Sequence, residues 1–101
     1  MEEDYTVPYR RSFFRYIVEA SANLIIDKLR TPVIVKDLCS RGVCIFSNLP
    51  LEVSREIEIE IVSFFDKPVY RKAKIVWSKE IDDNLWQAGL DFGLDNLIEL
   101  K

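Results

Sequence analysis

Residues 56–65 read EIEIEIVSFF and carry the clearest structural pattern in the chain. Glutamates at positions 56, 58 and 60 alternate with isoleucines at positions 57, 59 and 61. Successive side chains of a β-strand point to opposite faces of a sheet, so the isoleucines share one face and the glutamates the other. We therefore predict a strand over residues 56–65 that buries its isoleucines and exposes a solvated row of glutamates with no acid–base role.

Five other segments fit the same kind of element, and they cover residues 15–26, 33–38, 43–47, 69–77 and 85–92. The first of these fits helical and strand periods imperfectly, and we assign it as a strand because strands follow it. Ser40, Arg41 and Gly42 form a turn signal between the second and the third segment, which predicts a hairpin. A polar loop, SKEIDDN, precedes the last strand, and the tail adds one turn of helix at most.

Six short strands separated by turns at short intervals favour an all-β barrel or sandwich. Closure into a barrel would remove the exposed edges of such a small sheet. A chain of 101 residues suits one compact domain. We therefore predict a six-stranded antiparallel β-barrel over residues 16–101, preceded by a flexible N-terminal arm over residues 1–15 that contains Pro8.

The composition argues against several classes of function. The chain has no histidine and only two cysteines, Cys39 and Cys44, so a zinc site is poorly supplied and the commonest general base is missing. We also find no P-loop and no nucleophile with a visible base, so we expect no enzyme activity. No apolar run reaches the ~20 residues of a membrane helix, and the acidic start MEEDYT has no apolar signal region. We therefore expect a cytoplasmic protein with free thiols and no membrane insertion.

The net charge of −3 hides an uneven distribution. Residues 9–41 carry seven basic and three acidic groups, a net charge of +4, whereas residues 51–101 carry seven basic and eleven acidic groups, a net charge of −4. The basic half can attract an anion locally. The acidic half argues against a protein that binds nucleic acid polymers, because such proteins are normally basic over a whole face.

Two polar motifs stand out against this background. The first is an RxxxR spacing at Arg11 and Arg15, with Arg10 directly before it, and the second is the turn DLCSRG, which begins at Asp37. A guanidinium offers a planar fork of donors for phosphate oxygens and for the O6/N7 edge of guanine. A carboxylate can accept hydrogen bonds from the remaining guanine donors, and a glycine lets the backbone come close to a ligand. Together these groups match a guanine nucleotide with phosphates.

These motifs, followed by a G-x-x-F element at Gly89 and Phe92, resemble the PilZ domain family. The resemblance runs from about Tyr9 to Asn96, which is nearly the whole chain. It implies a bacterial six-stranded barrel that binds the second messenger cyclic di-GMP. In the family, the RxxxR arginines lie on an N-terminal arm and the DxSxxG residues lie on the barrel surface, and the ligand draws the arm onto the barrel.

The resemblance also implies a role for each matching residue. Arg11 and Arg15 would clamp phosphate and guanine, Asp37 would read the other guanine edge, and Gly42 would shape the turn. Arg10 resembles the residue that influences whether one ligand or a stacked pair binds, and an arginine there favours the stacked pair.

Cys39 departs from the family pattern, which has serine at this position. A thiol is a weaker hydrogen-bonding group than a hydroxyl and is larger. The loss of one neutral hydrogen bond costs about 0.5–1.5 kcal/mol, whereas the charge-assisted arginine contacts contribute about 1.5–3 kcal/mol each. We therefore expect weaker binding, by about tenfold, rather than none.

The leading hypothesis is a receptor that relays cyclic di-GMP to a separate, unidentified effector protein, since the chain has no obvious output domain. An alternative is a degenerate PilZ-type adaptor that acts by protein contact without the nucleotide, and Cys39 keeps this alternative open. A third possibility, an oligonucleotide-binding barrel that uses aromatic and basic residues, fits the net acidity least. We assign Trp77 and Trp86 to packing rather than to a ligand.

Overall fold

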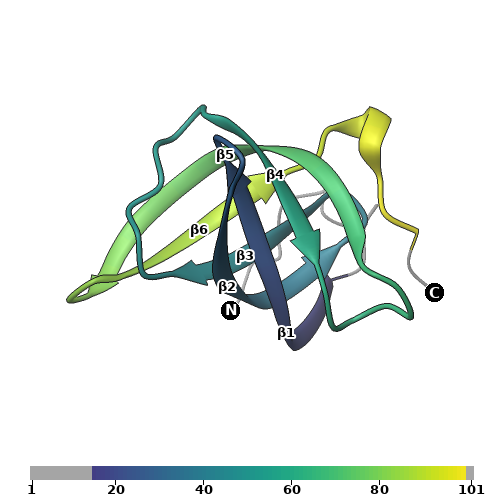
Figure 1. The fold of residues 1–101 in the computed structure, drawn as a ribbon, viewed down its shortest axis with the longest axis horizontal. Coiled ribbons are helices and arrows are strands. Elements are labelled where there is room, and N and C mark those ends of the chain that lie inside the picture. Colours follow the sequence, from purple (N-terminus) through teal and green to yellow (C-terminus); the bar gives the residue numbers. More distant parts are fainter. Residues whose placement is uncertain (1–14, 100–101) are drawn as a thin grey trace, which may run out of the picture.

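The structure is a computed structural model that describes the backbone of residues 15–99 and the side chains of residues 20–99. It is a closed antiparallel barrel with the strand order β1-β2-β3-β6-β5-β4 (Figure 1). The strands are β1 (Arg15–Ile26), β2 (Leu29–Cys39), β3 (Gly42–Ser47), β4 (Glu56–Ile61), β5 (Val69–Asp82) and β6 (Leu85–Asp91). One turn of 3-10 helix, η2 (Leu94–Asn96), follows β6. The predicted all-β class, the six strands and the short helical turn are confirmed.

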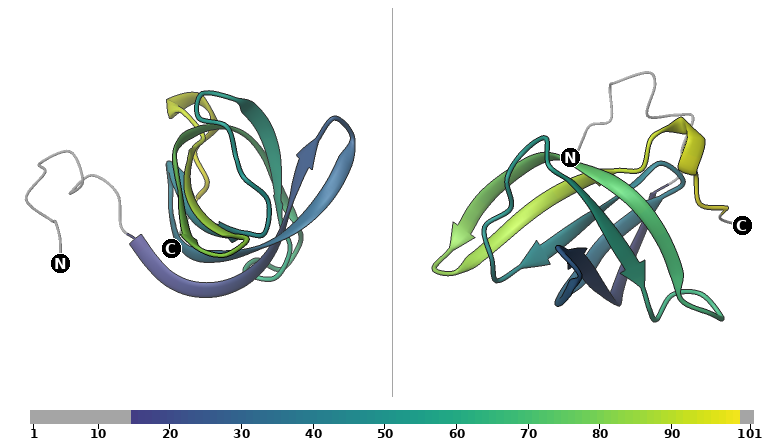
Figure 2. Two further views of the ribbon diagram at one scale, coloured as in Figure 1. Left: turned by 90° about the vertical axis from the view of Figure 1, so that its left-hand side faces the viewer. Right: turned by 45° about the horizontal axis from the view of Figure 1, so that its top comes forward.

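Two hairpins make the strands longer than the sequence pattern indicates. Asp27 and Lys28, with φ of 52° and 70°, form a two-residue turn that joins β1 to β2, so β2 begins at residue 29 and not at residue 33. A turn with positive φ at both positions matches the right-handed twist of its two strands. The β1–β2 hairpin projects from the side of the barrel (Figure 2).

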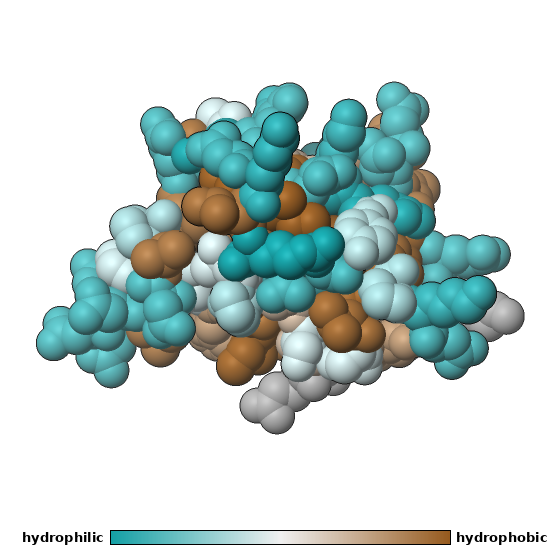
Figure 3. Space-filling model, viewed as in Figure 1, coloured by the Kyte–Doolittle hydropathy of each residue, from teal (hydrophilic) through white to brown (hydrophobic). Residues whose placement is uncertain are grey.

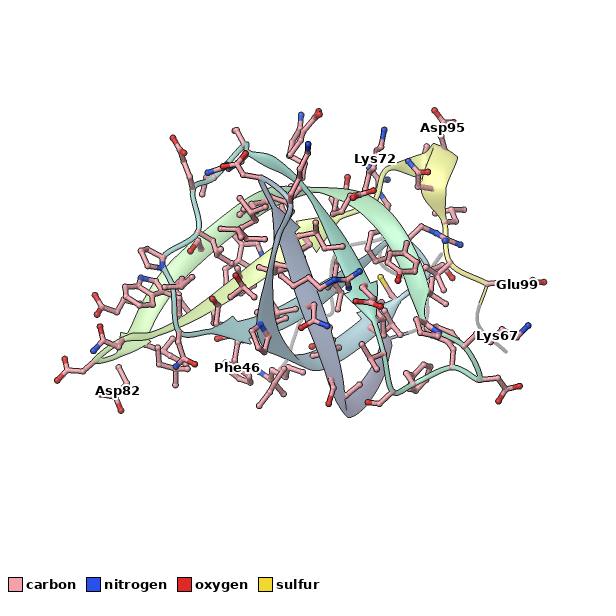
Figure 4. The ribbon with its side chains drawn as sticks, viewed as in Figure 1. Phe46, Lys67, Lys72, Asp82, Asp95 and Glu99 are labelled. Carbon is pink, nitrogen blue, oxygen red and sulfur yellow. The ribbon has the colours of Figure 1, made fainter. Side chains whose placement is uncertain are left out.

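The predicted polar loop before the last strand is wrong, because β5 continues through it to Asp82. The chain turns only at Asp83 and Asn84, and Asn84 has a φ of 55°. Residues 79–82 are all exposed, since this hairpin extends beyond the barrel and both of its faces meet water. Asp82 therefore lies at the opposite end of the molecule from Glu99 (Figure 4). The strand predicted over residues 56–65 is also shorter than expected, because β4 ends at Ile61.

The barrel interior is filled by the alternating apolar side chains of all six strands. On β4, Ile57, Ile59 and Ile61 are 5%, 0% and 0% exposed, as the alternation predicts. Each isoleucine of this kind contributes about 1.5–3 kcal/mol when fully buried. Outside, polar and apolar side chains are interspersed over the face formed by β1, β4 and β5 (Figure 3). Within residues 15–99, no helix is long and apolar enough to cross a membrane.

The prediction of a solvated glutamate row is wrong for Glu60, which is only 8% exposed. Its carboxylate accepts hydrogen bonds from the Tyr70 hydroxyl at 2.8 Å, from Asn23 Nδ2 at 3.2 Å and from the Arg30 guanidinium. These donors come from β5, β1 and β2, so one carboxylate joins four strands across the outer surface. Glu60 pairs directly with Asn23 in the four-residue β1–β4 ladder that closes the barrel. This cluster therefore reinforces a short seam of the fold.

The three donors favour the charged form of Glu60. The Tyr70 hydrogen bond, supported by those from Asn23 and Arg30, lowers the pKa of the Glu60 carboxyl below its ordinary value of 4.5, although burial opposes the shift. A depressed folded-state pKa means that the carboxylate stabilises the fold above the unfolded-state pKa. That contribution is lost as pH falls through the lower folded-state pKa.

We expect Glu60→Gln to lower the melting temperature at neutral pH more than Glu58→Gln does. Glu58 lies on the same face of the same strand, but its carboxylate accepts no hydrogen bond from a described side chain. The gap between wild type and Glu60→Gln should narrow once the pH falls below about 4.5, and thermal melts over a pH series would measure it. A gap that stays constant down to pH ~3 would show that the Glu60 charge does not stabilise the seam.

Candidate functional site

The register of the sheet aligns outward-facing residues in rows that run across the strands. Asp37 on β2 lies opposite Cys44 on β3, Cys44 lies opposite Gly89 on β6, and Gly89 lies opposite Trp77 on β5. Directly opposed residues of a sheet share a face. Leu38, the chain neighbour of Asp37, is fully buried in the core, so these four residues face outward. We call them the first row.

The two middle members of the first row are small, and a tryptophan leans over them. A Cβ atom added to Gly89 would lie 2.2 Å from Trp77 Nε1, so the indole rests directly on the glycine backbone. Trp77 is nevertheless 40% exposed. With strands about 4.8 Å apart, the row spans about 14 Å from β2 to β5. Cys44 thus lies between the Asp37 carboxylate and the indole that covers Gly89.

Asp37 has an unusual position for an outward-facing carboxylate. It is 8% exposed, which places it among the few buried charged residues of the described chain. The register of β2 against β3 shifts between Val35 and Asp37, so a bulge sets the position of this side chain. Few water molecules reach a shielded carboxylate to compete for its oxygens. It therefore accepts hydrogen bonds from a bound molecule more strongly than an exposed carboxylate would.

A second row runs beside the first, one two-residue step or about 6.7 Å away along the strands. Arg15 pairs with Cys39, Gly42 pairs with Asp91, and Asp91 pairs with Lys74. Cys39 ends β2 and Gly42 begins β3, so the turn between them lies within this row. We call these five residues the second row.

The turn between Cys39 and Gly42 is held in place by the C-terminal segment. The Phe92 amide donates to the Arg41 carbonyl oxygen at 2.7 Å, and the Ile98 amide donates to the Ser40 carbonyl oxygen at 2.8 Å. Ile98 itself is 2% exposed, which anchors this segment in the core. Arg41 Nε also donates to Asp91 Oδ1 at 2.8 Å. These hydrogen bonds to the C-terminal segment therefore hold the turn in place without a ligand.

Gly42 is required for a different reason from the one that the sequence suggests. Its φ is not positive, so the turn does not depend on the conformational freedom of glycine. Instead, a Cβ atom at this position would meet the Leu90 carbonyl oxygen at 2.3 Å. Gly42 lets β3 approach β6 closely at the edge of the second row.

The structure brings together Asp37, Cys39 and Gly42, and it places the backbone of Arg15 beside them. Arg10 and Arg11 lie outside the described residues. Residues 1–15 as an N-terminal arm likewise remain a prediction, although Arg15 is already part of β1.

The sequence reasoning did not place Cys44, Gly89 and Trp77 in one row with Asp37. It assigned Trp77 to packing and used Gly89 only as part of a family pattern. The signal that joins them to Asp37 is the strand register. That register becomes visible only when the barrel closes.

Other kinds of site have less support in the described chain. Within residues 15–99, no three His, Cys, Asp or Glu side chains gather to hold a metal ion, and both cysteines are free thiols. An open groove of about 640 Å³ is lined by the β1–β2 hairpin, the first residues of β4, residues 72–74 of β5 and residues 91–96. Three lysines and four acidic residues line it, so it offers no preference for one sign of charge.

Gly42→Ala and Gly89→Ala separate the two close contacts. We expect Gly42→Ala to lose stability by about 1–3 kcal/mol, because the new methyl group meets the backbone of β6, which cannot move aside. Gly89→Ala meets only the Trp77 side chain, so we expect a smaller loss together with a changed tryptophan emission spectrum. Chemical denaturation followed by fluorescence measures both. Unchanged emission in Gly89→Ala would contradict the position of the indole.

Comparison with known families adds an independent finding. The sequence model of the PilZ domain matches residues 9–100, which include all six strands and both arginine-containing motifs. A comparison with curated proteins found no match. PilZ domains are in general receptors for cyclic di-GMP and in general lack enzymatic activity. Because the match covers nearly the whole chain, this protein belongs to the PilZ domain family.

Proposed function

We propose that this protein is a cytoplasmic, non-enzymatic receptor for cyclic di-GMP that relays the signal to a separate effector protein. The observation that carries the proposal is the register. It puts Asp37, Cys39 and Gly42 next to the point where the arginine motif enters the barrel. The family match agrees with this ligand class.

The first row accounts for the recognition of one guanine base. Asp37 accepts hydrogen bonds from the guanine N–H donors, and its shielding from water strengthens them. The base lies over Cys44, between Asp37 and the indole that covers Gly89. Trp77 then offers its exposed indole as a stacking surface, and stacking of a base on an aromatic ring contributes about 1–3 kcal/mol.

The arginine motif accounts for the phosphates. Arg15 begins β1 directly opposite Cys39, so it enters at the end of the second row. Four residues of extended chain span about 13 Å, which lets Arg11 reach from that point across the neighbouring strands. Guanidinium groups bind phosphate through pairs of parallel hydrogen bonds. Arg10 adds a further guanidinium, which supports binding of a stacked pair of ligands. Closure of residues 1–15 over the ligand is then the signal that the effector reads.

Calorimetric titration with cyclic di-GMP tests the proposal. We expect the wild-type protein to bind, and the double variant Arg11→Ala/Arg15→Ala to bind at least a hundredfold more weakly, because two charge-assisted contacts of about 1.5–3 kcal/mol are lost. Arg55→Ala is the matched control, since Arg55 pairs with Asp27 at 3.1 Å beside the β1–β2 hairpin. Trp77→Leu should weaken binding while Trp77→Phe retains most of it. No heat or thermal shift with the wild type at high micromolar ligand would refute the receptor.

Cys39→Ser restores the hydroxyl that the family has at this position. We expect it to tighten binding by up to about tenfold, the equivalent of one recovered neutral hydrogen bond. Cys44→Ser is the control, because Gln87 Nε2 donates to Cys44 Sγ at 3.3 Å and a hydroxyl can accept the same bond. Equal affinities of wild type and Cys39→Ser would show that this position makes no hydrogen bond to the ligand.

A second candidate function is an adaptor of the same fold that acts without the nucleotide. The thiol at position 39, in place of the serine of the family, is the observation that favours it. Capture of the same partner protein with and without cyclic di-GMP, together with a failed titration, would support the adaptor over the receptor.

A further inference from the structure

We propose that Arg41 is an additional phosphate-binding residue of this site, held in reserve by Asp91, and that Lys74 neutralises Asp91 when Arg41 turns to the ligand. This inference rests on the proposed function, because it names a further contact of the same site. It adds a guanidinium that lies outside the RxxxR motif.

Arg41 is placed at the edge of the second row by a fixed backbone and a movable side chain. Its carbonyl oxygen accepts the Phe92 amide at 2.7 Å, so the main chain stays where it is. Among the side chains that the structure describes, its guanidinium makes one ion pair, with Asp91 at 2.8 Å, and the two side chains are 44% and 31% exposed. An exposed ion pair is weak, because water competes for both partners. The side chain can therefore leave Asp91 without a large loss.

The position of the second row makes a phosphate the natural ligand for Arg41. The proposed guanine lies on the first row, about 6.7 Å away along the strands, so the sugar–phosphate part of the same ligand extends over the second row. An unpaired Asp91 at this place would repel a phosphate. The Arg41 guanidinium, one residue before Gly42, can bind that phosphate through two parallel hydrogen bonds. This contact is stronger than its single hydrogen bond to the Asp91 carboxylate.

Lys74 supplies the positive charge that would otherwise be missing beside Asp91 once Arg41 has left. It lies directly opposite Asp91 on β5, and its other cross-strand neighbour is Glu56 on β4. Within residues 15–99, Lys74 forms no ion pair, so its ammonium group is available. Opposite charges that face each other across two strands attract. Departure of Arg41 therefore leaves Asp91 beside a cation rather than alone.

Titration of wild type and variants with cyclic di-GMP tests the inference. We expect Arg41→Ala to weaken binding by about tenfold to a hundredfold, and Arg41→Lys to fall between that variant and wild type, since an ammonium keeps the charge but not the paired hydrogen bonds. Asp91→Asn should tighten binding by about threefold, because it releases Arg41. Thermal melts without ligand establish that each variant is folded.

A double-mutant cycle isolates the role of Lys74 as a positioning residue. Lys74→Gln should weaken binding by about threefold, and the effect should vanish in the Asp91→Asn background, because no carboxylate then needs a cation. Lys72→Gln is the matched control on the same strand. Lys72 faces Glu58, and it extends from the end of the molecule near Asp95 (Figure 4).

The outcomes distinguish the two proposals. A wild type that binds cyclic di-GMP together with an Arg41→Ala variant that binds equally well would overturn the inference and leave the receptor intact. A wild type that does not bind would refute both. Equal effects of Lys74→Gln with and without Asp91 would overturn the part that concerns Lys74.

Discussion

The closure of the barrel through the β1–β4 ladder is the constraint on which the rest of the structure depends. Only four residue pairs make this ladder, yet it fixes the register of all six strands around the ring. A slip of one residue would turn every side chain of a strand to the opposite face. The alternating isoleucines of β4 oppose such a slip from the inside. Glu60 opposes it from the outside, because its three donors come from the two neighbouring strands, β1 and β5, and from β2 beyond β1.

The same register builds the site. Each row combines residues that lie far apart in the chain, and none of them forms the site alone. Asp37 comes from a bulge of β2, Trp77 from a bulged stretch of β5, and between them in the row lie a cysteine and a glycine. Both glycines of the site act by their lack of a side chain. Gly42 lets two strands approach, and Gly89 lets an indole lie against the backbone. Packing rather than backbone flexibility therefore explains both.

Charge is distributed to match this arrangement. The outer face of β4 carries three glutamates, of which Glu60 is satisfied within the barrel surface. Lys74 on β5 lies between Glu56 of β4 and Asp91 of β6. Asp91 in turn forms an ion pair with Arg41, which joins β6 to the turn before β3. A protein with a net charge of −3 thus holds two cations, Arg41 and Lys74, on either side of Asp91. Arg41 comes from the turn before β3 and Lys74 from β5, so a count of charges along the chain does not show that they flank the same carboxylate.

The sequence by itself determined the fold class, the six strands and the identity of the turn that contains Asp37, Cys39 and Gly42. It could do so because a two-residue period and a turn signal are local properties of the chain. It did not determine that Glu60 is buried, that β5 runs on through a polar segment, or that Trp77 faces the same surface as Asp37. The β5 extension depends on pairing with β6 across a hairpin, and the other two facts depend on more distant residues, such as Tyr70 for Glu60 and Trp77 for Asp37. Only the closed barrel brings such residues onto one surface, because strand pairing, and not chain order, sets which side chains become neighbours.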